Sequence, residues 1–192
     1  MGEVKKPLPV QFVAGLIVNP AEGFGRLRGA LVEAWGGIDM ESPVWPFVWT
    51  DYYEGEMGKG LMRQFVAFEK LVEVEGLHRT KIASNEMERR LAAGGETGTS
   101  RRVNIDPGYI CHSKLVLFST KDFAHRIYVG DGVLAESTLE WRGGRFTPHA
   151  WTFPDYRTEE YRNFLTEVRG QYVRKLKSAE YAGRFDSGPE SV

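Results

Sequence analysis

Near the start of the chain, a continuous run of apolar residues is followed by apolar residues at helical spacing. The run Val10–Val18 is almost wholly apolar and predicts a first strand. Residues 19–22 then offer an asparagine N-cap, a proline at the first helical position and a glutamate placed for a capping box. Apolar side chains recur at helical spacing until two glycines at positions 36 and 37. We therefore expect a helix that begins after Asn19 and ends before Gly36.

The next segments predict one more strand and one more helix. Residues 44–50 form a second apolar run, in which Pro46 suits an edge strand because it lacks a backbone donor. Residues 51–58 are polar and predict a loop. Within residues 61–75 one helical face is apolar, so a helix is expected that stops at Gly76. The residues of that face are Leu61, Phe65, Phe68 and Val72.

A further helix and a loop complete the middle of the chain. Residues 82–93 are expected to be helical, with Ser84 as the cap and Met87 and Leu91 one turn apart. The sequence GGETGTS at residues 94–100 predicts a disordered loop or a lid.

From Val103 onward the apolar period changes to two. Strands are expected near residues 103–105, 115–119, 127–129 and 133–141, with glycine-rich turns at residues 130–132 and 143–144. A last helix, capped by Thr158, should lie across the sheet. The whole pattern predicts an α+β fold: a single domain over residues 1–185 with a mainly antiparallel sheet, including a C-terminal meander, packed by three to four helices. Residues 186–192 are expected to be a disordered tail.

Composition agrees with an ordinary globular protein. Hydrophobic residues make up 42% of the 192 residues and charged residues 27%, so one folded core is expected. The 25 Lys and Arg nearly cancel the 26 Asp and Glu. No overall positive field therefore exists to hold a polyanion or an acidic membrane by charge alone.

Cysteine usage and hydropathy bear on location. Cys111 is the only cysteine, which excludes an internal disulfide and a multi-cysteine zinc site within one chain. No window approaches the roughly 20 apolar residues that a membrane helix needs, and the apolar start lacks a convincing cleavage site. These features favour a cytoplasmic protein with no membrane partner.

Asn104 and Asp106 precede a proline and a glycine. The pair Pro107-Gly108 favours a type II turn, because glycine can take positive φ. Such a turn would place Asn104 and Asp106 at a strand end, where they could orient a ligand or a metal-bound water. The commoner structural alternative is that Asp106 bonds its own turn amides.

The predicted hairpin brings opposite charges together. Arg126, Glu136 and Thr138 would share one face, because side chains two apart along a strand point the same way. A basic and an acidic group facing each other suggest a site for a polar, anionic ligand. An ordinary cross-strand ion pair is the more common outcome.

His125 is the best-placed general acid or base. It begins a predicted strand beside Lys121 and Arg126, whose charges favour the neutral imidazole. Lys114 and Arg157 would add cations around an anionic ligand. A lone histidine at a strand end is nevertheless more often a structural hydrogen-bonding residue.

Acidic and phenolic side chains cluster at residues 51–56. Asp51, Tyr53 and Glu56 are candidates for ligand binding there, since carboxylates and a phosphate ligand can hold magnesium together. More often an acidic loop is merely solvated. Asp155, within the segment of residues 151–156 that precedes Arg157, is a further candidate for ligand binding. No spacing typical of a metal site occurs, so no metal ligand and no cofactor is assigned.

Two stretches interleave aromatic and basic residues, at positions 125–128 and 141–146. Such stretches could form a stacking platform for single-stranded RNA or DNA, although the balanced charge argues against high affinity. The glycines of residues 23–29 do not have the spacing of a dinucleotide-binding loop and are expected inside the first helix.

Several of these segments together resemble a protein family. The resemblance is to a prokaryotic family of unknown function recognised by its Asp-Pro-Gly motif, and it covers about residues 10–172. It implies no catalytic assignment, but it implies that the polar motifs form a recurring constellation. The segments are TDYYEGEMG at 50–58, NIDPGY at 104–109, KLVL at 114–117, KDFAHRIY at 121–128 and WTFPDY at 151–156.

Three functions are compatible with the sequence. The first is binding of, or catalysis on, a small phosphorylated or carboxylated molecule, with Asp106 or Glu136 orienting it and His125 as acid or base. The second is a single-stranded nucleic-acid module that uses the same face. The third is a structural or partner-binding protein. A mixed polar constellation favours the first, whereas the sequence leaves the ligand, the reaction and the oligomeric state open.

Overall fold

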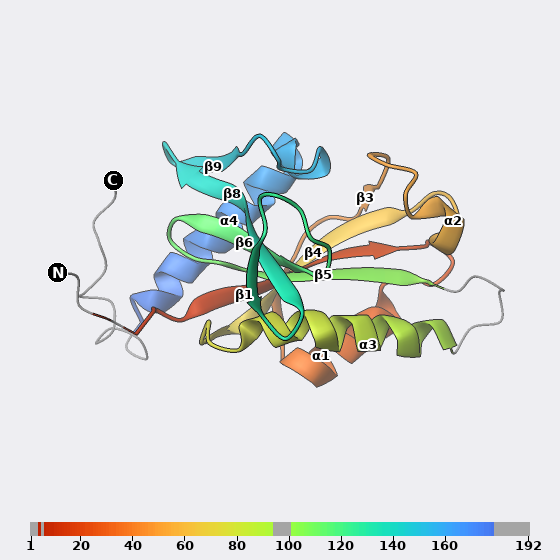
Figure 1. Ribbon diagram of the computed structural model, residues 1–192, viewed down its shortest axis with the longest axis horizontal. Coiled ribbons are helices and arrows are strands. Elements are labelled where there is room, and N and C mark those ends of the chain that lie inside the picture. Colours follow the sequence, from red (N-terminus) through yellow and green to blue (C-terminus); the bar gives the residue numbers. More distant parts are fainter. Residues whose placement is uncertain (1–3, 5, 94–100, 179–192) are drawn as a thin grey trace.

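The computed structural model describes residues 4, 6–93 and 101–178, which form one α+β domain. A nine-stranded antiparallel sheet has helices on both faces (Figure 1). Its strand order is β2-β4-β1-β5-β6-β8-β7, with β3 paired to β4 and β9 to β8. The predicted α+β class and mainly antiparallel sheet are therefore confirmed. In the described part of the chain, no helix is both long and apolar enough to cross a membrane.

The elements follow one another in a simple order. The strands are β1 Val10–Val18, β2 Ile38–Glu41, β3 Trp45–Pro46, β4 Met62–Val72, β5 Val103–Ile110, β6 Lys114–Ser119, β7 Ile127–Gly130, β8 Val133–Arg142 and β9 Arg145–Pro148. The helices are α1 Gly25–Trp35, α2 Glu54–Met57, α3 Thr80–Ala93 and α4 Glu159–Leu176, with short 3-10 helices η1 Leu77–Arg79 and η2 Asp155–Arg157.

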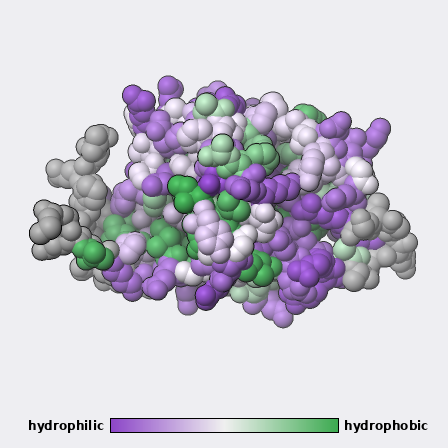
Figure 2. Space-filling view, in the orientation of Figure 1, coloured by the Kyte–Doolittle hydropathy of each residue, from purple (hydrophilic) through white to green (hydrophobic). Residues whose placement is uncertain are grey.

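The central strand β1 divides the interior into two cores. Phe12 and Leu16 pack with Leu31 of α1 and Met87 of α3 on one face of the sheet. Val13 points to the other face, where α4 covers it. Figure 1 shows the same layers, with α1 and α3 together on one side of the sheet and α4 on the other. The outer surface in Figure 2 mixes hydrophilic and hydrophobic residues, and hydrophilic ones prevail at its rim.

The helix predicted over residues 61–75 is wrong, because this segment is the strand β4. Its apolar residues match a helical spacing, but Phe65, Val66, Ala67 and Phe68 are four consecutive buried positions. Phe65 enters the core under α4, whereas Val66 enters the core under α1 and α3. A continuous buried run of this kind fits a strand that is covered on both faces.

The start predicted for the first helix is also wrong, since α1 begins at Gly25. The Asn19 carboxamide accepts a hydrogen bond from the Ala21 amide at 3.0 Å and donates one to the Met57 carbonyl at 2.6 Å. Asn19 therefore closes a local turn and ties it to α2 instead of capping a helix. Gly23, with a φ of 64°, lies before the helix, whereas Gly25 and Gly29 lie within it.

Other predicted elements differ in extent. The apolar run at residues 44–50 contains only the two-residue strand β3, whereas β2 has no counterpart in the prediction. The loop expected at residues 51–58 includes the short helix α2. Ser84 lies inside α3, where its hydroxyl donates to the Lys81 carbonyl, so it is not the cap.

The C-terminal elements agree more closely with the prediction. Both glycine-rich turns are present, and Asp131 between its two glycines takes a φ of 52°. The Thr158 side chain caps α4, and that helix lies across the sheet as expected. The meander is interrupted, however, because β6 pairs with β8 and leaves β7 at the edge. Residues 94–100 and the tail at 186–192 lie outside the described residues.

The predicted turn at Pro107-Gly108 is wrong, because both residues lie within β5. Ile105 directs its amide away from β1, toward the Glu88 carboxylate, and Pro107, two residues on, has the same orientation. The strand β6 pairs with β5 only from Gly108 onward. At Pro107 no strand therefore lies on that side to accept a backbone hydrogen bond, and the missing N–H of proline costs nothing. At Gly108 an added Cβ would lie 2.2 Å from the Val116 carbonyl oxygen. The motif is thus a place where β6 joins β5 closely.

Replacing Gly108 with alanine should lower the free energy of unfolding by about 1–3 kcal/mol, because overpacking of a closely packed interior has that cost. Urea unfolding measures the change. Gly29→Ala is the matched control, since no atom lies within 4 Å of its added Cβ. A helical alanine there should instead stabilise the protein by about 0.5–1 kcal/mol. Equal stability of the Gly108→Ala and native proteins would contradict the close approach of β6.

Candidate functional site

A buried arginine lies at the centre of the polar residues on the α4 side of the sheet. Arg63 of β4 has 1% of its side chain exposed, and its Nη2 donates to the Tyr156 hydroxyl at 2.6 Å. Nη1 lies 3.5 Å from an Asp106 carboxylate oxygen, and Nη2 lies 3.8 Å from one of Asp155. The guanidinium also lies over the ring of Phe65, with its carbon 4.6 Å from the ring centre. One cation thus joins β4, β5 and η2.

Gly15 of β1 leaves the space that this arginine occupies. It pairs with Phe65 on β4 and with Asp106 on β5, so it lies between the strands that Arg63 connects. A Cβ at Gly15 would come within 2.6 Å of Arg63 Nη2 and 3.0 Å of the Tyr156 hydroxyl oxygen. The glycine is therefore required for close approach across β1.

Burial and neighbouring residues shift the pKa of Arg63 in opposite directions. Burial lowers the pKa of Arg63, but its interactions with Tyr156, Asp155 and Asp106 raise it and prevail. Burial raises the pKa of Tyr156 well above its ordinary value, so its hydroxyl is neutral near pH 7. The two carboxylates are therefore the groups that keep Arg63 charged. Burial also raises the pKa of Asp155, against the opposing effect of Arg63.

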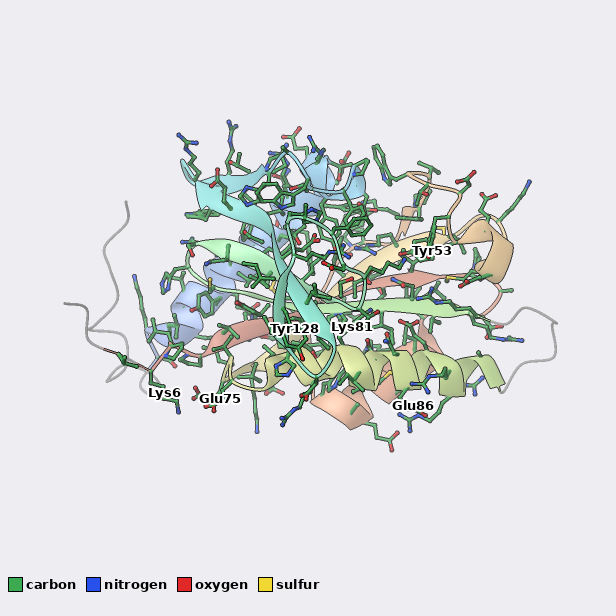
Figure 3. All side chains as sticks on the ribbon, viewed as in Figure 1. Lys6, Tyr53, Glu75, Lys81, Glu86 and Tyr128 are labelled. Carbon is green, nitrogen blue, oxygen red and sulfur yellow. The ribbon has the colours of Figure 1, made fainter. Side chains whose placement is uncertain are left out.

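Asp106 is the partly exposed member of this group, with 27% of its side chain accessible. One carboxylate oxygen accepts from Asn104 Nδ2 at 2.7 Å as well as from Arg63. The other lies 3.6 Å from the ammonium group of Lys81. Lys81 extends from α3 toward β5, on the side opposite to α4 (Figure 3). Three side chains thus fix a carboxylate that solvent can still reach.

The edge of β5 that β6 leaves open is closed by side chains. Glu88 of α3 accepts a hydrogen bond from the Ile105 amide at 2.8 Å, and Lys81 donates to the Ile105 carbonyl at 2.8 Å. Arg101 bonds both Glu88, at 2.7 Å, and Asn104 Oδ1, at 2.5 Å. These bonds satisfy backbone groups that would otherwise be an exposed strand edge.

The loop at residues 51–56 reaches this network through two of its three candidate residues. Glu56 lies 3.4 Å from Arg101, and the Arg101 guanidinium lies over the Tyr53 ring, 5.5 Å from its centre. Burial and the Asp106 charge raise the pKa of Tyr53. Asp51 is exposed at the start of the loop, away from these bonds.

A second polar group surrounds Glu136 of β8, which is 3% exposed. Its Oε2 accepts from Arg126 Nε at 2.7 Å and lies 3.0 Å from His125 Nε2, while Oε1 accepts from the Thr138 hydroxyl at 3.1 Å. Arg126 also donates to Ser119 and to the Lys121 carbonyl. The predicted shared face of Arg126, Glu136 and Thr138 is therefore present.

The two polar groups lie on the same face of the sheet. Glu136 pairs with Leu117, and Leu117 pairs with Gly108, which is two residues from Asp106. Because neighbouring strands are about 4.8 Å apart, Glu136 and Gly108 are separated by about 10 Å across the sheet. The Glu136 charge also contributes to the raised pKa of Tyr156. The two groups are neighbours, but within the described part of the chain no hydrogen bond or ion pair joins them directly.

Four aromatic rings form a nearly parallel row beside Glu136. Ring centres are 6.0 Å apart for Phe123 and His125, 5.7 Å for His125 and Trp151, and 4.6 Å for Trp151 and His149, with interplanar angles of 7°, 12° and 13°. Trp151 is fixed by its indole N–H, which donates to the Ser137 carbonyl at 2.9 Å. Phe123 is 51% and Trp151 42% exposed, so part of the row is accessible to solvent. Within the row, however, Trp151 is stacked with both His125 and His149, and the Arg126 guanidinium lies over the Phe123 ring, 4.8 Å from its centre.

The other three predicted cations, Lys121, Arg157 and Lys114, differ in their partners and in their exposure. Lys121 is exposed and donates to the Tyr52 hydroxyl at 2.8 Å. Arg157 donates to three backbone carbonyls, at positions 149, 150 and 152, and so holds the loop before η2. Lys114 is exposed at the start of β6, opposite Glu140 and away from Glu136. In the described ranges, no three His, Cys, Asp or Glu side chains gather as a metal site would require.

Several residues of the site are missing from the sequence prediction. Arg63 and Tyr156 are among them, as are Lys81, Glu88 and Arg101. A signal for Arg63 exists, because an arginine inside the apolar run of residues 61–72 must be paired if that run is a buried strand. The helical interpretation places it on an exposed face instead.

Glu88 should make stability depend on pH. Burial raises the pKa of Glu88 above its ordinary value of 4.5, and Lys81 and Arg101 oppose the shift. Stability from a raised carboxyl pKa is present below the unfolded value and lost as the pH rises through the folded value. The unfolding free energy of the native protein, relative to Glu88→Gln, should therefore be larger near pH 4 than near pH 7.

Urea unfolding across that pH range measures the difference. Glu86→Gln is the matched control, because it removes an exposed carboxylate from the same helix. A difference between the native and Glu88→Gln proteins that grows with rising pH would contradict the role of burial at Glu88.

Comparison with known proteins identifies a family. The model of a family described as Domain of unknown function (DUF4416) matches residues 8–172. The match spans β1 to α4 and includes all the residues of both polar groups, and it confirms the resemblance to a family of unknown function. Neither a curated protein nor a solved structure matches the chain.

Proposed function

The chain belongs to the DUF4416 family, and we propose that it binds and acts on a small ligand that combines a flat ring with an anionic group. The proposed site is the surface formed by the ring row, Lys121 and the partly exposed carboxylate of Asp106, with the buried carboxylate of Glu136 behind His125. The observation that carries the proposal is His125, which is bonded to a buried carboxylate and stacked in a row of accessible rings.

The contact between Glu136 and His125 suits acid–base chemistry. An ionised carboxylate only accepts hydrogen bonds, so the 3.0 Å contact assigns the imidazole proton to Nε2. In the neutral ring, Nδ1 is then the free acceptor. Because Arg126 and Thr138 hold Glu136 in turn, the orientation of His125 is fixed. A base oriented by a buried carboxylate is an arrangement that supports proton transfer.

The ring row supports recognition of a flat ligand. Aromatic surfaces bind other flat rings by stacking, with a contribution of about 1–3 kcal/mol for a nucleobase. Phe123, the exposed ring at the end of the row, is the candidate for such a surface, and Trp151 holds the row in place because its N–H is bonded to the backbone. A nucleotide has the required combination of a flat ring and an anionic phosphate.

The anionic group would meet fewer cations than the sequence suggests. Arg126 is bonded to Glu136, and Arg157 is bonded to backbone carbonyls, so neither is available without breaking those bonds. Lys121 is exposed, and its contact with Tyr52 is one that an anion could replace. Asp106 would accept a hydrogen bond from a hydroxyl or amino group of the ligand.

Single-stranded nucleic acid is the second candidate, and the length of the ring row is the observation that favours it. Because the rings already stack on one another, a base would stack at the exposed end of the row. The balance of 25 basic and 26 acidic residues weighs against it, because backbone neutralisation dominates nucleic-acid affinity. A structural or partner-binding role predicts instead that the same residues affect stability alone.

Calorimetric titration with the four ribonucleoside monophosphates, ribose 5-phosphate and a twelve-residue oligouridylate, with and without magnesium, separates these functions. We expect a mononucleotide to bind and Trp151→Leu to weaken it at least about tenfold, since loss of a stacked ring costs about 1–3 kcal/mol. The control is Trp49→Leu, which removes another exposed tryptophan outside the row. His125→Asn should retain the ligand but abolish its turnover, which chromatography of the incubated ligand detects.

Binding of the oligonucleotide alone, with a steep decrease in salt, would favour the second candidate. No binding by any of these compounds would contradict the proposed ligand class. Equal affinity of the native and Trp151→Leu proteins would remove the ring row from the site.

A further inference from the structure

The strand β7 forms a free edge of the sheet. It is the last strand in the order and pairs only with β8, so alternate residues direct their N–H and C=O groups away from the sheet. In Figure 1 the hairpin of β7 and β8 lies in front of the other strands. Within the described ranges, no hydrogen bond other than those with β8 reaches the backbone of residues 127–130. The outward backbone groups are therefore available to another strand.

The side chains of this edge are apolar and exposed. Ile127 is 73%, Tyr128 66% and Val129 39% exposed, and residues 127–130 carry no charge. An aromatic side chain has about 150–250 Å² of surface, so these three residues together leave on the order of 300 Å² of largely apolar surface in water. A standard interface buries about 800 Å² on each partner, and somewhat more than half of that area is apolar. The edge thus supplies the larger part of the apolar area that one side of a stable dimer needs.

Two other free edges of the sheet are protected against the addition of a strand. At the opposite end of the sheet, β2 carries Asp39 and Glu41, which pair with Lys175 at 2.9 Å and with Arg28 at 2.7 Å. The open part of β5 is closed by side chains from α3. Charges on an edge strand and covering side chains are common means of preventing strand addition. Apart from a register shift before Gly130, β7 has no such protection.

The charges at the two ends of β7 are balanced. Before the strand, Lys121 and Asp122 are exposed side by side in the sequence, and after it Asp131 pairs with Arg79 at 2.8 Å. Antiparallel pairing of two identical strands across a two-fold axis puts the start of each strand beside the end of the other. No excess of like charge would therefore meet in such a pair. An acidic or a basic peptide, in contrast, would find no complementary charge along this edge.

We propose that this edge binds a second copy of the chain, with the two β7 strands antiparallel across a two-fold axis, so that two sheets join into one. A helix or a loop as partner would leave the outward N–H and C=O groups of β7 unpaired, whereas a second β7 pairs with them. The apolar side chains of each copy would cover those of the other. The dimer is separate from the proposed function, and either can fail without the other.

Sedimentation equilibrium of the full chain, from about 1 to 200 μM, measures the association, and we expect dimers with a Kd below about 100 μM. Ile127→Lys should raise this Kd at least about tenfold, because a lysine on an edge strand opposes pairing with another strand. Its matched control is Val48→Lys, which adds the same charge at a site that is 78% exposed and follows β3, several strands away in the sheet. The control should dimerise as the native protein does.

Cross-linking tests which surface forms the dimer. In a Cys111→Ser background, a single cysteine is placed in turn at Ile127, Tyr128 and Val129, and a short bismaleimide is added. Opposite and diagonal neighbours on paired strands lie within about 8 Å, so at least one of these cysteines should join two chains efficiently, whereas Val48→Cys should not. The proposal is overturned if the native protein is monomeric at about 200 μM, or if the two lysine variants change the Kd equally. Failure of all three β7 cysteines to cross-link would also overturn it.

Discussion

The buried guanidinium of Arg63 is the group on which the arrangement of the α4 face depends. A cation with 1% exposure is tolerated only if carboxylates and hydrogen-bond acceptors replace water around it. Asp106 supplies one from β5, while Asp155 and Tyr156 supply others from η2, the short helix just before α4. Gly15 gives the guanidinium room to cross β1. One charge therefore fixes the relative positions of two strands and the start of α4.

The candidate site follows from these positions. Asp106 is held on one side by Arg63 and on the other by Lys81, so it stays ordered although solvent reaches it. The loop that ends in η2 begins with Trp151, and this ring completes the row that contains His125. The packing that satisfies the arginine thus also brings the fixed carboxylates and the exposed rings to one face. A stacked, carboxylate-bonded imidazole beside them is the geometry that supports a ligand with a flat ring and an anionic group.

The sequence predicts what depends on local pattern and misses what depends on distant pairing. Thr158 marks the start of α4 correctly because a cap acts within one turn. Phe65 and Phe68 match a helical spacing, and only the burial of both faces of β4 shows that they belong to a strand. Gly108 follows a proline, as glycine often does in a turn, yet glycine is required there because the Val116 carbonyl of another strand leaves no room for a Cβ. Arg63 is missed for the same reason, since its three partners lie far along the chain.

A comparison of unfolding free energies in a double-mutant cycle of Arg63 and Asp155 tests the central claim most directly. Arg63→Met leaves a buried carboxylate without its cation and should lower the free energy of unfolding by about 3–5 kcal/mol. Asp155→Asn added to that variant removes the uncompensated charge, so the double variant should be more stable than Arg63→Met alone. If the two losses simply add, so that the double variant is the least stable of the set, Arg63 and Asp155 are not coupled and the account is contradicted.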